Sequence, residues 1–408
     1  MRKPFALCVS ALFLLSACTP GNVQISDKSP EEQLKDSSFV VYAAGDYHAA
    51  DGLENNPGSS VLFYDSEARE WSDIATEGLN KADFNFDGER LYYRDQSNDY
   101  ILDSNGLKTI EHGYELTPHI MLSFSLPITE GGSVALDNVG FIDEKGSGYE
   151  WKIIVNEGET RKVFRLPHNL EYAAQCEDGS IWGKTTPYLS STNSGYGAAE
   201  SPAQYLSLYP DFKTEPVGDF KYNKLHSDDN DLVCKDKKLY HIVDNFKSEI
   251  TSPMGGGPQD YEGSSLVSYD IGTGEFFEKE ITGDWSTRIN DEMWNPAFIS
   301  KYVYKNDLWW VSGSGDVIKT DLETAHNTKM FELADYDASS DPGFLEFKDN
   351  YLFQIKFWKG KDADIYRFNL DTGELEKHST IPDFVEVEKR NQFPAAVEIT
   401  DLEKMLNL

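Results

Sequence analysis

Three histidines recur at nearly matching places in successive segments of the chain. His168 and His226 each stand eight residues before a cysteine, at Cys176 and Cys234, and His119 lies at nearly the same place in the preceding segment. Three neutral imidazoles with one open position form the ligand set of a catalytic or structural divalent metal. The alternative interpretation is that each ring makes only local hydrogen bonds on a hydrated connection. A metal site therefore requires a fold that brings all three side chains to one point.

A second set of candidate residues is aromatic or cationic and lies in long connections rich in glycine and serine. Such connections inside a compact domain are usually functional or disordered, and both interpretations stand for residues 193–201. Exposed tyrosine, tryptophan and arginine are typical of recognition surfaces. The candidate ligand-binding residues are Tyr47, Tyr188, Tyr196, Tyr261, Trp285, Arg288 and Trp294, with Asn295 beside the last of them.

Several common chemistries are not indicated. The sequence has no Gly-x-Ser-x-Gly elbow and no phosphate-binding glycine loop with a lysine, so catalytic residues stay unassigned. Asp83, Asn85 and Asp87 match the start of a calcium loop, but Arg94 stands where a bidentate glutamate is needed, and a β-hairpin is predicted instead. A net charge of −33 excludes nucleic acid as a partner, because phosphate recognition requires many lysines and arginines.

The first residues are typical of an export signal. Arg2 and Lys3 precede an apolar run too short to span a bilayer comfortably, and the run ends in LSAC at positions 15–18. This sequence resembles the bacterial lipobox, which implies removal of residues 1–17, acylation of Cys18 and a lipoprotein anchored to a bacterial cell membrane. The alternative is a plain secretory signal. Prolines, charges and the lack of periodicity predict a flexible tether over residues 18–37.

The elements that must position these residues are short strands in repeated units. The clearest unit, Gly343–Ile381, contains four runs of aromatic and β-branched residues separated by Asp-, Asn- and Gly-rich turns. Its first hairpin recurs along the chain as FDGERLY, CEDGSIW, CKDKKLY, VYKNDLW and FKDNYLF. Seven units of about 50 residues with four antiparallel strands are typical of β-propeller blades.

The repeats thus resemble the bacterial extracellular β-propellers, a WD40-like and kelch-like superfamily, without the specific motifs of any subfamily. We expect an all-β, seven-bladed propeller of four-stranded blades over residues 38–400, followed by a short tail, 401–408. The first unit has only three strands, beginning at Ser38. The run Phe393–Thr400 is therefore predicted to supply its fourth strand and close the ring.

Cys176 and Cys234 occupy equivalent positions in neighbouring units. Export favours a disulfide between them, whereas the spacing of about 10 Å between packed sheets favours two buried thiols. Both interpretations stand at this point.

Two functions compete. The first is a membrane-anchored, extracytoplasmic binding module that holds a peptide, glycan or protein on its loop-rich face, with no membrane contact except the lipid anchor. The second is a metal-assisted lyase or hydrolase that uses the axial histidines. The missing nucleophile and base motifs favour the binding module.

Overall fold

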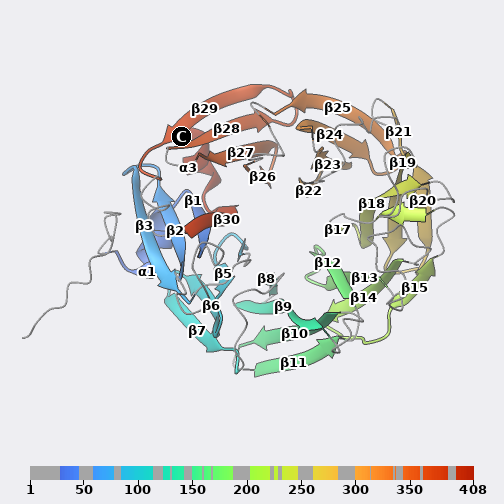
Figure 1. The fold of residues 1–408 in the computed structure, drawn as a ribbon, viewed down its shortest axis with the longest axis horizontal. Helices are drawn as coiled ribbons and strands as arrows, with labels where there is room; N and C mark the ends of the chain where they lie inside the picture. The colour runs from blue at the N-terminus through green and yellow to red at the C-terminus, as the bar shows by residue number, and fades with distance from the viewer. Residues whose placement is uncertain are drawn as a thin grey trace, which may run out of the picture.

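The computed structural model is a ring of seven β-sheets (Figure 1). It describes residues 28–45, 58–77, 84–113, 123–128, 131–141, 149–158, 160–166, 169–186, 203–220, 225–227, 232–246, 261–283, 299–312, 314–333, 336, 343–358, 362–384 and 392–408. Each sheet has four main antiparallel strands, which lie side by side in order from the centre of the ring to its rim. The predicted seven-bladed propeller is confirmed.

The first three blades come from both ends of the chain. Blade 1 comprises β30 (Gln392–Ile399), β1 (Phe39–Gly45), β2 (Ser59–Asp65) and β3 (Glu70–Thr76). Blade 2 comprises β4 (Asn85–Phe86), β5 (Leu91–Arg94), β6 (Asn98–Asp103) and β7 (Gly106–Glu111). Blade 3 comprises β8 (Ser123–Ile128), β9 (Gly132–Phe141), β10 (Tyr149–Glu157) and β11 (Thr160–Leu166).

The remaining blades follow in chain order. Blade 4 comprises β12 (Asn169–Gln175), β13 (Ile181–Thr186), β14 (Ala203–Tyr209) and β15 (Val217–Phe220). Blade 5 has an interrupted first strand and comprises β16 (Leu225–Ser227), β17 (Val233–Lys235), β18 (Lys238–Phe246), β19 (Tyr261–Asp270) and β20 (Phe276–Glu280). Blade 6 comprises β22 (Ile299–Tyr304), β23 (Asp307–Val311), β24 (Asp316–Asp321) and β25 (His326–Glu332), and blade 7 comprises β26 (Phe344–Lys348), β27 (Tyr351–Phe357), β28 (Ala363–Asn369) and β29 (Leu375–Ile381).

The short strand β21 (Thr282–Gly283) pairs in parallel with β25, the outer strand of blade 6. The end of blade 5 is thus already part of the next sheet.

The ring closes as the sequence predicted. β30 pairs antiparallel with β1 over seven residue pairs, from Phe39 opposite Ile399 to Gly45 opposite Gln392. Pairing the two ends of the chain in one blade satisfies the backbone groups that an open sheet edge would expose.

The two faces of the ring differ in their connections. On the turn face, tight hairpins join strands one to two and three to four. The Asp87 carboxylate, for example, accepts the backbone N–H groups of Glu89 and Arg90 at 2.9 and 2.8 Å, and Gly88 supplies a φ of +98°. The alternating strand directions send the longest connections, residues 46–57, 187–202, 247–260 and 284–298, from the opposite face, here called the loop face.

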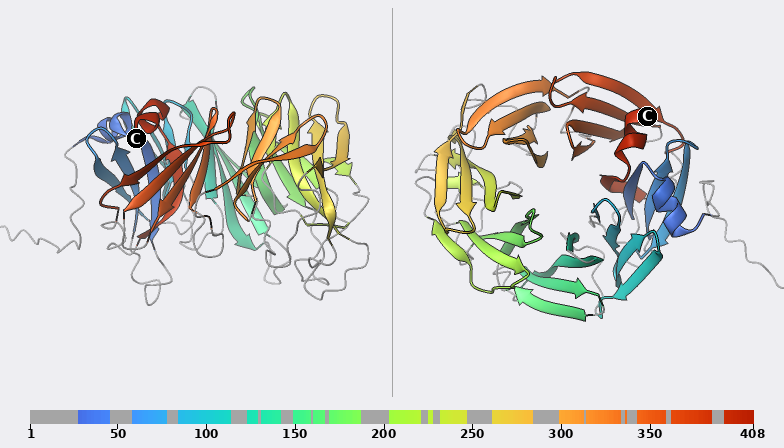
Figure 2. Two further views of the ribbon diagram at one scale, coloured as in Figure 1. Left: turned by 90° about the horizontal axis from the view of Figure 1, so that it is seen from above. Right: turned by 180° about the vertical axis from the view of Figure 1, so that it is seen from behind.

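Two short helices lie on the turn face, at the upper edge of the left view in Figure 2. Helix α1 (Pro30–Asp36) has Pro30 in its first turn and an N-terminal capping box, in which Glu32 accepts the backbone N–H of Ser29 at 2.9 Å. Leu34 is buried between blades 1 and 2. The predicted flexible tether is therefore wrong for residues 30–36, because a capped helix packs there.

The C-terminal tail also has structure. Helix α3 (Leu402–Asn407) begins where the Asp401 carboxylate accepts the backbone N–H of Lys404 at 3.0 Å. Met405 is buried in the apolar cluster between blades 7 and 1.

The core consists of apolar clusters between neighbouring blades. Side chains alternate along each strand, so that in β23 Leu308 and Trp310 face blade 5, whereas Trp309 and Val311 face blade 7. In the described part of the ring, six interfaces each have such a cluster. The interface between blades 2 and 3 is instead centred on charged side chains, which makes it the first place to examine for function.

Candidate functional site

Most residues that the sequence nominated lie outside the described part of the chain. This applies to Cys18, Tyr47, His119, His168, Tyr188, Tyr196, Trp285, Arg288, Trp294 and Asn295. For His226 and Tyr261 the structure describes the backbone only: His226 in β16 pairs with Asn245, and Tyr261 at the start of β19 pairs with Phe246. Convergence of the three histidines on one metal stays a prediction, and the residues described contain no other group of three potential metal ligands.

The two cysteines are joined. Cys176 follows β12 in blade 4, Cys234 lies in β17 of blade 5, and their Cα atoms are 4.9 Å apart in a disulfide. The expected spacing between sheets does not prevent the bond, because first strands converge toward the axis of the ring. The covalent link therefore ties two blades at their inner edges.

The interface between blades 2 and 3 contains a buried ionic network. Arg94 at the end of β5 donates from Nε to Asp99 Oδ1 at 2.6 Å and from both terminal nitrogens to Asp137 of β9. His112 Nε2 lies 2.9 Å from Asp99 Oδ1, and Asn156 of β10 donates to Asp99 Oδ2 at 3.2 Å. All five side chains are buried, so the network joins the two blades through polar contacts.

Asp99 is held in its charged form by its neighbours. Burial alone would raise the pKa of Asp99, but the Arg94 guanidinium and the hydrogen bond from His112 outweigh burial and hold the pKa far below its usual value. The network therefore depends on the ionised carboxylate of Asp99, which is buried inside the ring away from solvent.

This network was not predicted from the sequence, although the repeated hairpin contained a signal for it. Arg94 and Lys184 stand at equivalent places in blades 2 and 4, three residues after the Leu or Ile of the motif, where Ile242, Val311 and Ile355 stand in blades 5, 6 and 7. Both cations are fully buried. Comparison of the repeats position by position would have singled them out.

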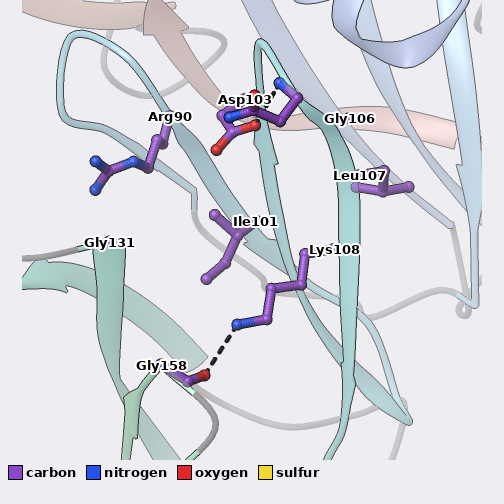
Figure 3. A pocket seen from close by; sticks show the side chains of 9 residues that line it. Arg90, Ile101, Asp103, Gly106, Leu107, Lys108, Gly131 and Gly158 are labelled. Carbon is purple, nitrogen blue, oxygen red and sulfur yellow. Dashed lines mark hydrogen bonds between the residues drawn. The ribbon is translucent and has the colours of Figure 1, made fainter.

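Above the ionic network, the same interface opens at the turn face as a cleft of about 420 Å³ (Figure 3). Blade 2 supplies most of the lining, including Arg90, Ile101 and Lys108, and blade 3 supplies Gly131 and Gly158. The ammonium of Lys108 donates to the carbonyl of Gly158 at 3.0 Å, across the cleft. Glycines on the blade 3 side leave space that larger side chains would fill.

The close approach at Gly131 explains why a glycine is needed there. Its φ is +78°, and a Cβ added to it would lie 2.9 Å from Nη1 of Arg90. The Arg90 guanidinium thus lies directly against bare backbone of blade 3, at the lip of the cleft.

A second polar cluster lies at the loop-face end of blade 7. The Asp364 carboxylate accepts hydrogen bonds from the Trp358 indole at 2.9 Å and the Thr380 hydroxyl at 2.9 Å, and lies 3.0 Å from His378 Nε2. The His378 ring stacks on Tyr366 with centroids 4.4 Å apart and remains about half exposed. This end of the ring therefore presents ordered aromatic and polar groups to solvent.

Comparison with known proteins identifies the family. The model of the YycP β-propeller domain matches residues 32–403. The chain belongs to the YycP β-propeller family. "Uncharacterized protein YycP" from Bacillus subtilis (strain 168) is 22% identical over 352 residues, which cover 85% of this chain and 83% of the relative. The match begins inside α1 and ends inside α3, so the family domain extends into the regions that were predicted to be a tether and a tail.

This YycP-family protein is also distantly similar to solved structures. Apo AztD from Citrobacter koseri is 10% identical, with a TM-score of 0.41 over 88% of this chain and 98% of that one. Cobalt-substituted ACO from Synechocystis is 9% identical, with a TM-score of 0.47 over 90% and 93%. Within the described residues, no helix is long and apolar enough to cross a membrane.

Proposed function

We propose that this YycP-family protein is an extracytoplasmic binding module, held at a bacterial membrane by acyl chains on Cys18, whose loop face binds a peptide, glycan or protein. The observation that carries the proposal is the division of the ring into two faces. The longest connections, with the candidate aromatic and cationic residues, leave from the loop face, whereas the chain enters the ring on the turn face.

The entry point of the chain supports this orientation. Lys28, which precedes α1, is fixed at the turn face by ion pairs with Asp36 at 2.8 Å and Asp65 at 3.0 Å. Cys18 stands ten residues earlier, and ten residues reach at most about 35 Å. Acyl chains on Cys18 would therefore keep the turn face toward the membrane and leave the loop face free.

Two further features agree with export and recognition. The disulfide between Cys176 and Cys234 suits an oxidising compartment. Trp358 and His378 show that aromatic groups already gather at the loop-face end of blade 7. Recognition surfaces rely on such side chains, because they bury large area at low entropic cost.

Membrane fractionation of a Cys18→Ala variant tests the anchor. We expect this variant to leave the membrane fraction, because the acyl chains supply the proposed anchor. Cys8→Ala is the matched control, since Cys8 lies within the apolar run of the signal. Equal retention of the Cys18→Ala and Cys8→Ala variants would contradict the anchor.

Cosedimentation with cell-envelope material tests the loop face. We expect a triple variant with alanine at Trp285, Arg288 and Trp294 to bind less than the parent. A control triple with alanine at Lys305, Phe277 and Leu375 also removes one cation and two exposed apolar side chains, but none lies on the loop face. If only the control triple variant lost binding to the envelope material, the assignment of the loop face as the binding surface would be contradicted.

A further inference from the structure

The cleft between blades 2 and 3 contains a lysine without an anionic partner. The ammonium of Lys108 contacts the carbonyl oxygen of Gly158, and no carboxylate of the described residues lies within ion-pair distance of it. Its positive charge is directed across the mouth of the cleft (Figure 3).

The second cation of the cleft also retains hydrogen-bonding capacity. Arg90 donates from Nη1 to the Tyr92 hydroxyl at a long 3.4 Å, and its nearest carboxylates, Asp87 and Glu89, lie 3.6 and 3.7 Å away. A guanidinium has five N–H donors in a planar fork that suits two oxygens of one anion. Most of these donors have no partner at normal hydrogen-bond distance among the described residues.

We propose that this cleft is a binding site for a small molecule that carries a carboxylate or phosphate group. The group lies between Arg90 on the lip and Lys108, both of which extend from blade 2. The buried Ile101 side chain forms an apolar floor, and Asp103 and Asn105 at one end offer partners for a hydroxyl or an amine. The volume of about 420 Å³ falls in the range of small-ligand sites, roughly 300 to 1,000 Å³.

The rest of the interface explains why the cleft stays open. The network of Arg94, Asp99 and Asp137 holds blades 2 and 3 together below it. Asn156 of blade 3 also donates to Asp99 of blade 2 at 3.2 Å. These contacts fix the two blades relative to each other, and the ligand does not have to separate them. This site is on the turn face and does not depend on the function proposed for the loop face.

Calorimetric titration of the purified full-length protein tests the site. Succinate and glycerol 3-phosphate are the probes, and succinamide and glycerol are their uncharged counterparts. We expect saturable binding of at least one charged probe, no binding of either uncharged one, and about tenfold weaker binding in each of the variants Arg90→Gln and Lys108→Gln. Lys108 is exposed, so its replacement leaves the fold intact.

Lys162→Gln is the matched control. Lys162 is an exposed cation on β11 of blade 3 that pairs with Glu157 and lies outside the cleft lining. Its loss changes the net charge by the same amount and should leave probe binding unchanged. No saturable binding of either charged probe, or an equal loss in Lys162→Gln, would overturn the proposal.

Phosphate groups could come from a soluble metabolite or from a lipid headgroup, and vesicles distinguish the two. The Cys18→Ala protein is mixed with phosphatidylglycerol vesicles and, separately, with phosphatidylcholine vesicles. Binding to phosphatidylglycerol that depends on Arg90 and Lys108 supports the site with a headgroup as the ligand. If the protein binds glycerol 3-phosphate but does not bind either kind of vesicle, the result supports the site with a soluble ligand.

Discussion

The guanidinium of Arg94 in blade 2 donates to the carboxylate of Asp137 in blade 3, with Nη2 and Oδ2 3.2 Å apart, and neither side chain is exposed to solvent. Six other interfaces in the described ring are joined by apolar side chains. At this interface a directional ionic contact takes the place of the apolar contacts found elsewhere. It holds together the two blades that line the cleft proposed to bind a carboxylate or phosphate group.

Removal of Arg94 should destabilise the protein strongly. Arg94→Met leaves Asp99 and Asp137 buried without their cation, and breaking a buried pair in this way costs about 3 to 5 kcal/mol. Urea unfolding measures the change. The control is Lys305→Ala, whose exposed bridge to Asp371 should contribute less than about 1 kcal/mol. Equal urea midpoints for the two variants would contradict a structural role for the network.

The stability of the protein should depend on pH through Asp99. Its folded pKa lies below the unfolded value of 3.8, so its contribution is fully present above about pH 4 and is lost as pH falls further. Asp99→Asn removes this contribution, and we expect a variant that is less stable at pH 7 with a flatter profile below pH 4. Thermal unfolding across pH 2 to 7 measures both effects. Parallel profiles for parent and variant would exclude Asp99 as the cause.

The disulfide should stabilise the ring. Cys176 and Cys234 are 58 residues apart in sequence, and cross-links that close loops of this size contribute about 2 to 4 kcal/mol. The double variant Cys176→Ser, Cys234→Ser should unfold at lower urea. Thiol labelling of the denatured, unreduced parent should find neither cysteine reactive. Two reactive thiols there would contradict the bond.

Ring closure by β30 should be essential for stability. Ile399 is fully buried opposite Phe39, and Ile399→Ala should cost about 2 to 5 kcal/mol. Phe393 on the same strand is 38% exposed, so Phe393→Ala should cost less than about 1 kcal/mol. Urea unfolding of both variants compares the two sites directly. The opposite order of stabilities would argue against closure through this strand.

Much of the fold followed from local sequence. Turn residues such as Asp87 and Gly88 mark the ends of short runs of alternating apolar and polar residues. The strand at residues 393–400 belonged to no other unit, and the first unit lacked one strand, so the two could be paired. The capped helix at residues 30–36 was missed because seven residues are too few to show helical periodicity, although Pro30 and the Ser29 to Glu32 capping box were visible.

The site was harder to predict than the fold. The ionic network joins Arg94 to Asp137, 43 residues apart, and only the arrangement of blades brings them together. The cleft exists because Gly131 and Gly158 face Arg90 and Lys108 and leave space between the blades. A local sequence motif does not show that a glycine will leave such space in the fold. The sequence left the pairing of Cys176 with Cys234 undecided for the same reason. The distance between first strands near the axis cannot be derived from the spacing of residues in the sequence.

Photo-crosslinking in intact cells tests most directly whether the loop face is the binding surface of a membrane-anchored module. A photoreactive amino acid is placed at position 294 on the loop-face connection, or at Lys305 or Asp178 on the turn face. The proposal predicts a discrete crosslinked product from position 294 and none from either turn-face position. The product from position 294 should also be lost when the protein is irradiated in a lysate that lacks the partner instead of at the cell envelope. Crosslinks from the turn-face positions alone would contradict it.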